Sequence, residues 1–118
     1  MEHGGSREKR PEVQRIFEVG NAEMLEKTVE RHLVEGVKKL GGLCYKFVSP
    51  GTQGVPDRLI ITAQGRIIFA ELKTDKGALS KIQEYVIGQM RLRHADVRVL
   101  YGLKQVKEFL AEIGGEVQ

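Results

Sequence analysis

Two short apolar runs, separated by a connection that contains glycine, constrain the fold of this chain more than any other feature. Residues 58–62 and 66–70 are rich in β-branched and apolar side chains, and Ala63-Gln64-Gly65 lies between them. Runs of this kind joined by a short glycine-containing loop are typical of a β-hairpin. We therefore predict two antiparallel strands at the centre of the fold.

The length of the loop sets the register of this hairpin. If the loop has three residues, Thr62 pairs with Arg66 and Asp57 lies directly opposite Glu71. A two-residue loop shifts the pairing by one position but leaves both acids at the same end of the hairpin. Because side chains alternate along a strand, Glu71 and Lys73 share a face, and with the longer loop Asp57 shares it too.

Two carboxylates in this arrangement indicate a cation site. Directly opposed strand residues have Cβ atoms roughly 4.5–5.5 Å apart, and carboxylates that close repel each other unless a cation or a proton lies between them. A Glu-Leu-Lys triplet alone more often marks solvated strand positions or a weak ion pair. The Pro-Asp pair facing it and the apolar neighbours of both acids favour a site, because an unpaired carboxylate there is costly. Carboxylate and carbonyl oxygens are the ligands that Mg²⁺ prefers.

These residues resemble a known nuclease motif. Asp57, followed after the hairpin by Glu71-Leu72-Lys73, is similar to the PD-(D/E)xK motif. The wider pattern resembles the VRR-NUC branch of that superfamily in its compact phage and bacterial form: Gly42, Lys46, Gly54-Val55-Pro56-Asp57-Arg58, Glu71-Leu72-Lys73 and Gln83. The resemblance runs roughly from Met24 to the C-terminal helix. It implies an α/β fold with a restriction-endonuclease-like core, in which a mixed sheet of about four strands is flanked by helices in the order α-β-β-β-α-β-α.

The segment before the hairpin is predicted to be a helix followed by a strand. Apolar residues recur at helical spacing between Leu25 and Leu40, which predicts an amphipathic helix over residues 22–40 with Asn21 as its N-cap. Residues 43–48 alternate in polarity and predict the first strand.

The segment after the hairpin is predicted to be helix, strand and helix. Ser80 is positioned to cap the first of these helices. Because that helix separates residues 97–101 from the hairpin, we expect this strand to lie parallel to the strand of Glu71, through a right-handed crossover. The last helix presents one apolar face, formed by Val106, Phe109, Leu110 and Ile113.

Composition indicates one globular domain. The chain has 118 residues, of which 41% are hydrophobic and 30% charged, and no apolar run is long enough to span a membrane. We divide it into an N-terminal extension, residues 1–21, and a VRR-NUC-like nuclease domain, residues 22–118. In the extension, Arg7, Lys9 and Arg10 are interpreted as a solvated charge run rather than a DNA contact. The single cysteine, Cys44, excludes an intrachain disulfide and suits a reducing cytoplasm, that of a bacterium or a phage-infected host.

The resemblance also implies roles for individual residues. Asp57, Glu71 and the main-chain carbonyl of Leu72 are expected to bind Mg²⁺ or Mn²⁺, and Lys73 to position the attacking water. An acid on the first helix completes the metal environment; Glu30 is favoured and Glu26 is the alternative. Residues expected to support water or to contact DNA are Gln83, Lys46, Arg58, Ser49 and Gln53.

Three of these roles have a structural alternative. Arg58 is interpreted as a structural ion pair in preference to a phosphate contact. Lys46 suits a phosphate contact and a solvent-facing strand position equally well, and Gln83 has the alternative of an ordinary surface position.

The activity that the resemblance implies is metal-dependent hydrolysis of DNA phosphodiester bonds. It implies a structure-specific endodeoxyribonuclease that resolves four-way (Holliday) junctions as a homodimer. The alternatives are a catalytically idle nucleic-acid binding module on the same fold and a flap- or nick-directed nuclease. A hydrolase of small phosphorylated substrates is disfavoured, because the sequence has no glycine-rich phosphate loop followed by Lys-Ser or Lys-Thr. The net charge of +3 and the pI of about 9.1 permit a nucleic-acid partner without requiring one.

Overall fold

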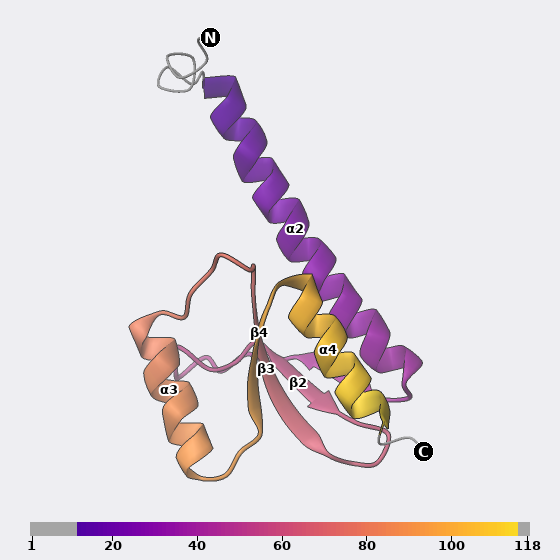
Figure 1. Cartoon of the computed structure of the whole chain (residues 1–118). Coiled ribbons are helices and arrows are strands. Elements are labelled where there is room, and N and C mark those ends of the chain that lie inside the picture. The colour runs from indigo at the N-terminus through magenta and orange to yellow at the C-terminus, as the bar shows by residue number, and fades with distance from the viewer. Residues whose placement is uncertain (1–11, 116–118) are drawn as a thin grey trace.

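The predicted order of helices and strands is confirmed. The computed structural model describes residues 12–115, with side chains described from residue 25 onward. Its elements run in the order α-β-β-β-α-β-α (Figure 1): α2 (Glu12–Lys39), β1 (Leu43–Lys46), β2 (Arg58–Ile61), β3 (Ile67–Lys73), α3 (Lys81–Leu92), β4 (Val97–Tyr101) and α4 (Gly102–Gly114). Within this part of the chain, no helix is both long and apolar enough to cross a membrane.

The four strands form one mixed sheet in the order β1-β2-β3-β4. The β1–β2 and β2–β3 pairs are antiparallel, whereas β3 and β4 are parallel, as the predicted crossover requires. In the hairpin Arg58 pairs with Ala70, and the Thr62 N–H donates to the Arg66 carbonyl at 2.9 Å. This is the register of a three-residue loop. Gly65 closes that loop with φ of +89°, a left-handed conformation that favours glycine.

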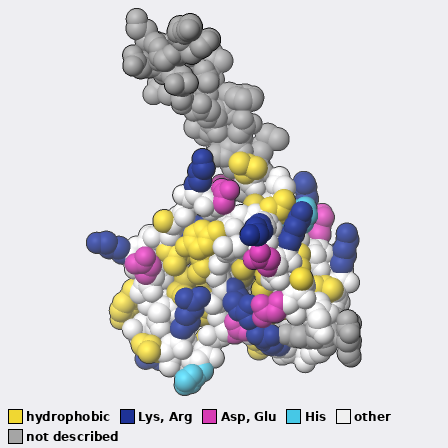
Figure 2. Space-filling view, viewed as in Figure 1, with side chains coloured by type: hydrophobic (Ala, Val, Ile, Leu, Met, Phe, Trp, Pro, Cys, Tyr) yellow, Lys and Arg dark blue, Asp and Glu magenta, His cyan; other side chains and the backbone are white. Residues whose placement is uncertain are grey.

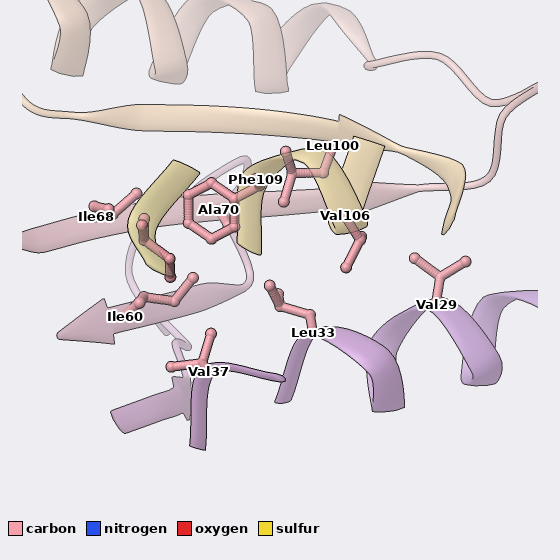
Figure 3. Close-up of a cluster of buried hydrophobic side chains, with 10 residues drawn as sticks. Val29, Leu33, Val37, Ile60, Ile68, Ala70, Leu100, Val106 and Phe109 are labelled. Atoms are coloured by element: carbon pink, nitrogen blue, oxygen red, sulfur yellow. The ribbon is translucent and has the colours of Figure 1, made fainter. Parts of the chain in front are cut away.

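Helices cover both faces of the sheet. The helices α2 and α4 pack on one face, and α3 lies on the other (Figure 1). The main core lies under α2 and α4, where one stripe of α2 meets the even-numbered side chains of the strands and the apolar face of α4 (Figure 3). Its buried members are Val29, Leu33, Val37, Ile60, Ile68, Ala70, Leu100, Val106, Phe109 and Ile113. This core fixes the ends of β2 and β3 against α2.

The first helix is longer than predicted. The prediction placed its start at residue 22, with Asn21 as N-cap, but α2 begins at Glu12 and Asn21 lies inside it. Residues 12–21 contain no proline and one glycine, Gly20. A single glycine costs a helix roughly 1 kcal/mol relative to alanine, which is too little to end it. The division at residues 21 and 22 therefore does not coincide with a break in secondary structure.

Of two other predictions, one strand is shorter than predicted, and the other prediction concerns residues that the structure does not describe. The strand predicted over 43–48 ends at Lys46, although the Phe47 N–H still donates to the Asp57 carbonyl at 2.9 Å. The basic residues Arg7, Lys9 and Arg10 lie outside the described residues.

Candidate active site

The candidate site lies where β2 begins and β3 ends. The hairpin register continues one position beyond the Arg58–Ala70 pair, which places Asp57 opposite Glu71. Pro56 is fully buried and anchors the chain just before Asp57. Since Lys73 follows Glu71 by two positions on the same strand, its side chain starts on the same face. The three central residues of the motif are thus brought together by the pairing of one hairpin.

A cleft of about 270 Å³ opens at this end of the sheet. Its walls come from α2 and from the ends of the two hairpin strands. It is lined by Glu26, Lys27, Val29, Glu30, Asp57, Leu72 and Lys73. Both candidate acids of the first helix therefore face the cleft that Asp57 and Lys73 share.

Two carboxylate oxygens at the site are buried and have no hydrogen-bond partner among the described residues: Asp57 Oδ1 and Glu71 Oε1. Burial raises the pKa of Asp57, and hydrogen bonding from the Leu72 backbone and the charge of Arg58 offset only part of this effect. Burial also raises the pKa of Glu71, and the neighbouring Asp57 charge raises it further. Both carboxyls are thus held in surroundings that favour a proton or a cation beside them.

The second carboxylate oxygen of Glu71 is held from two sides. The Gln83 side-chain amide donates to Oε2 at 3.0 Å, and Lys73 Nζ lies 3.7 Å from the same oxygen. Gln83 is itself fixed by a capping box, in which Ser80 Oγ accepts from the Gln83 N–H and Gln83 Oε1 accepts from the Ser80 N–H. The predicted cap at Ser80 is confirmed, and it aims Gln83 at the site.

Arg58 connects the first helix to the hairpin. Its Nη2 lies 2.5 Å from Glu30 Oε2, and its side chain is only 12% exposed. This arrangement matches the structural alternative for Arg58 rather than a free phosphate contact. It also means that Glu30 reaches the cleft with one carboxylate oxygen already paired.

The remaining predicted contacts lie outside the cleft lining. Lys46 is exposed and pairs with Arg58 in the β1–β2 ladder. Ser49 and Gln53 lie on the loop between these strands, where Ser49 is half-buried and Gln53 exposed. Gly54 brings this loop close to α3, since a Cβ at that position would lie 2.8 Å from the Ile82 carbonyl oxygen.

Sequence reasoning missed Lys27 as a residue of the cleft. A signal was present, because Lys27 precedes Glu30 by three positions, a spacing that places side chains on the same side of a helix. The described residues contain no group of three or more His, Cys, Asp or Glu side chains arranged to hold a metal. Any metal at this site would therefore rest on two carboxylates supplemented by carbonyl, water or substrate oxygens.

Comparisons with known proteins point to one family. A solved structure described as "VRR_NUC domain" superimposes with a TM-score of 0.69 at 32% sequence identity, covering 73% of this chain and 94% of that structure. "Putative nuclease p44" of Acyrthosiphon pisum secondary endosymbiont phage 1 is 58% identical over 48 residues, which are 41% of this chain. The match spans 52% of that relative, about half its length. No protein-family model matches the sequence.

The mixed sheet, the flanking helices and the facing acids of the hairpin define a nuclease domain. The extent and identity of the structural match place it more narrowly: the chain belongs to the VRR-NUC family.

Proposed function

We propose that this chain is a Mg²⁺- or Mn²⁺-dependent endodeoxyribonuclease whose active site is the cleft between α2 and the ends of β2 and β3. The observation that best supports this proposal is the pair of buried, unpartnered oxygens, Asp57 Oδ1 and Glu71 Oε1. Buried polar atoms in folded proteins almost always have a partner. Two such exceptions on facing carboxylates are what a site for a divalent cation requires.

The donor set fits the proposed metal. Mg²⁺ takes hard oxygen ligands and usually binds through one or two carboxylates, keeping waters and substrate phosphates as its other ligands. Asp57 and Glu71 would supply the carboxylates and Leu72 its main-chain carbonyl. When bound, such an ion polarises a phosphoryl oxygen and lowers the pKa of a bound water.

The residues around the acids have separate roles in the proposed reaction. Lys73, whose Nζ lies 3.7 Å from Glu71 Oε2, orients the oxygen of the attacking water toward the phosphate. Gln83 fixes the rotamer of Glu71 through its 3.0 Å hydrogen bond, so that Oε1 stays directed to the metal position. Glu30, paired with Arg58, completes the acidic wall, and Glu26 remains the alternative for this role.

The proposed substrate is branched DNA, cut by a homodimer at a four-way junction. This part rests on the family resemblance, and two sites on one dimer suit paired cuts across a symmetric junction. Lys46, Ser49 and Gln53 are the proposed DNA contacts, whereas Arg58, paired with Glu30, is assigned the structural role. Figure 2 shows Lys and Arg side chains spread over one face with acids among them, which agrees with phosphate contacts by dispersed cations. We place the protein in the cytoplasm, where Cys44, whose thiol pKa is raised by burial, stays reduced.

The first experiment is a cleavage panel. Labelled four-way junction, flap, nicked, single-stranded and duplex DNA are each incubated with EDTA, Mg²⁺ or Mn²⁺, with Asp57→Ala as the control. Symmetric cuts confined to the junction, absent with EDTA and in the variant, are the expected result. Cutting of flaps or nicks instead would leave the nuclease and remove the junction assignment. Metal-independent binding with no cutting on any DNA would favour the idle binding module.

A second experiment tests the role of Lys73. Lys73→Ala is expected to abolish cutting, because the attacking water is no longer oriented. DNA binding should stay largely unchanged, because the variant loses only one positive charge. Lys107→Ala, an exposed lysine on α4, is the matched control and should cut normally. Unimpaired cleavage by Lys73→Ala would remove this mechanism.

A further inference from the structure

A shallow groove of about 360 Å³ lies between α3 and the β1–β2 loop. It is lined by Thr52 of the β1–β2 loop and by Tyr85, Val86, Gln89, Met90 and Arg93 of α3. The two sides of α3 differ sharply: Ile87 is 2% exposed against the sheet, whereas Tyr85 is 67% exposed. The proposed cleavage reaction uses none of these groove residues.

The groove and the candidate active site are built from the same two segments. The loop that carries Thr52 leads directly into Asp57, and it is pressed against α3 at Gly54, where a Cβ would lie 2.8 Å from the Ile82 carbonyl oxygen. The first turn of α3 carries Gln83, which donates to Glu71. The same helix therefore lines the groove through Tyr85 and Met90 and contacts Glu71 through Gln83.

The chemistry of the groove suits a nucleobase. The phenol ring of Tyr85 offers an exposed aromatic surface, and Val86 and Met90 add apolar contacts beside it. Arg93 is held in place, because its Nη1 donates to the Gln89 backbone oxygen at 3.0 Å and to the Gln89 side-chain oxygen at 2.9 Å. Aromatic rings that stack on bases, combined with arginine, are the usual means of holding unpaired nucleotides.

We propose that this groove binds an unpaired nucleobase of the DNA strand that enters the active site, with Tyr85 as the stacking platform and Arg93 at the adjacent phosphate. The inference rests on the proposed nuclease function and adds to it a contact with a nucleotide that is unpaired at the branch point. Charge favours this occupant over a second copy of the chain. The lining residues include a cation and no carboxylate, so an identical face offers Arg93 no acidic partner within the groove, whereas a polyanion is complementary.

The test compares two exposed tyrosines. Tyr85→Ala removes the platform, Tyr85→Phe keeps the ring, and Tyr45→Ala removes a ring that is 52% exposed on β1, away from the groove. Affinity for a labelled single-stranded oligonucleotide and for a blunt duplex is measured by fluorescence anisotropy with Ca²⁺ on the full chain. Base–aromatic stacking contributes about 1–3 kcal/mol per base, so Tyr85→Ala is expected to bind the single strand roughly 5- to 150-fold more weakly. Tyr85→Phe, Tyr45→Ala and all duplex affinities should change less than about twofold on the same scale.

Three results would overturn the inference. One is an equal loss for the single strand and the duplex; another is unchanged single-strand binding by a Tyr85→Ala protein that melts like wild type. The third is a fall in the sedimenting mass of Tyr85→Ala, which would identify the groove as a subunit contact.

The inference and the proposed function fail separately. A wild-type protein that cuts no DNA ends the nuclease proposal, while the binding comparison still tests the groove. A Tyr85→Ala protein that binds single strands and cuts DNA as wild type does ends the groove proposal and leaves the nuclease.

Discussion

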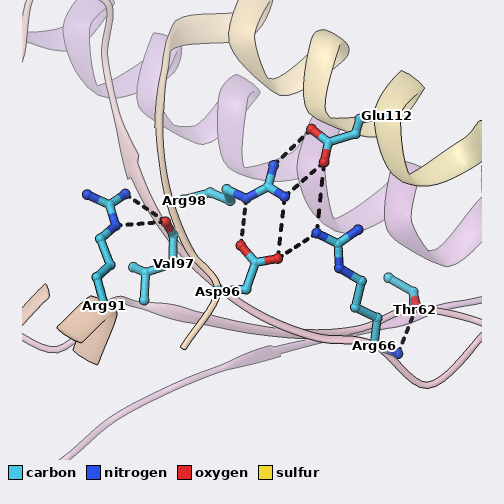
Figure 4. A network of polar contacts seen from close by, with 7 residues as sticks. All are labelled: Thr62, Arg66, Arg91, Asp96, Val97, Arg98 and Glu112. Atoms are coloured by element: carbon cyan, nitrogen blue, oxygen red, sulfur yellow. Dashed lines mark hydrogen bonds and ion pairs between the residues drawn. The ribbon is translucent and has the colours of Figure 1, made fainter. Parts of the chain in front are cut away.

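Acidic and basic side chains lie at both ends of β3, but the acids are fully paired at one end and only partly paired at the other. At its first end, Arg66 joins Asp96, Arg98 and Glu112 in a connected network (Figure 4). At its last end, Glu71 faces Asp57 across the hairpin, and one oxygen of each acid is buried without a partner among the described residues. Only four residues, 67–70, separate Arg66 from Glu71 along the chain.

The network at the first end is almost fully paired. Asp96 receives Arg98 Nε on Oδ1 and Arg66 Nη2 on Oδ2, each at 2.6 Å. Arg98 also forms two hydrogen bonds to Glu112 at 2.8 and 2.9 Å, and its guanidinium lies 5.6 Å from the centre of the Phe109 ring. Burial raises the pKa of Asp96, but the arginine hydrogen bonds outweigh it and the net pKa is lowered. This network ties β3, β4 and α4 together.

The difference lies in the partners, not in the acids. Arginine forks satisfy both oxygens of Asp96 and so stabilise its charged form. Glu71 has a glutamine and a lysine on one oxygen and, within the described part of the chain, no hydrogen-bond partner on the other, and its pKa is raised by burial and by Asp57. An acid pair that is incomplete in this way stabilises the protein poorly, and under the proposed function the missing partner is a divalent cation.

The largest expected effect comes from neutralising the incomplete pair. Asp57→Asn should lower the cleavage rate by about 1,000-fold or more, a loss of roughly 4 kcal/mol in transition-state stabilisation, because a metal ligand is lost. The metal-free variant should be as stable as wild type or more stable, since an uncompensated buried charge is removed. Cleavage on a junction panel and urea unfolding in EDTA measure the two quantities. A variant that is inactive because it is unfolded would contradict the comparison.

Binding of a divalent cation between Asp57 and Glu71 should raise the free energy of unfolding. A ligand at 100 times its Kd adds about 2.7 kcal/mol to the free energy of unfolding, so saturating Mn²⁺ should raise the Tm of the wild type. Asp57→Asn should show little of this rise, whereas Asp96→Asn should show it in full. An equal rise in all three proteins would indicate nonspecific binding and remove Asp57 from the metal site.

Sequence patterns predicted the arrangement of Asp57, Glu71 and Gln83 well, because it depends on residues that are close together in the sequence. The separation of Asp57 from Glu71 depends only on the loop after Thr62, and the cap that aims Gln83 depends on Ser80, three residues earlier. Turn and cap geometry are governed by neighbouring residues. The hairpin, the helix cap and the convergence of the three motif residues therefore followed from the sequence, whereas the choice between the two loop lengths needed the structure.

The long-range ion pairs could not be predicted in the same way. Arg66 and Asp96 are 30 positions apart, and Glu30 and Arg58 are 28 apart. These ion pairs exist only after β4 has docked beside β3 and α2 has packed on the sheet, so no sequence spacing reveals them. Arg58 shows the consequence, because its role as an ion pair or a phosphate contact was open until the position of α2 was known.

Removing the centre of the network should destabilise the fold without impairing chemistry. Asp96→Asn leaves Arg66 and Arg98 with weaker partners, and hydrogen bonds to charged groups contribute about 1.5–3 kcal/mol. Because the Asp96 side chain is 25% exposed, we expect about 2 kcal/mol of lost stability. Cleavage per folded molecule should match wild type. A loss of activity at temperatures where the variant is fully folded would show that the two ends are coupled.

The two ends should also respond to pH with opposite signs. The folded-state pKa of Asp96 is lowered, so its contribution is complete above the ordinary carboxyl pKa of about 4 and is lost as the pH falls through the folded value. The pKa of Glu71 is raised, so its contribution is complete below that range and is lost as the pH rises. In EDTA, the deficit of Asp96→Asn should grow from pH 2 to pH 7, and the advantage of Glu71→Gln should grow over the same interval. Parallel pH curves for the two variants would contradict the contrast.

The smallest effect is expected for Glu112, which lies at the exposed edge of the network. Glu112 hydrogen-bonds Arg98, which lowers the Glu112 pKa, yet its side chain is 48% exposed. Ion pairs in such positions contribute about 0–1 kcal/mol because water screens them. Glu112→Gln should therefore cost less than about 1 kcal/mol, clearly less than Asp96→Asn, and the cost should shrink further in high salt. Equal costs for the two variants would mean that the four residues act as one unit, and that Arg98, shared by both acids, carries the stabilisation.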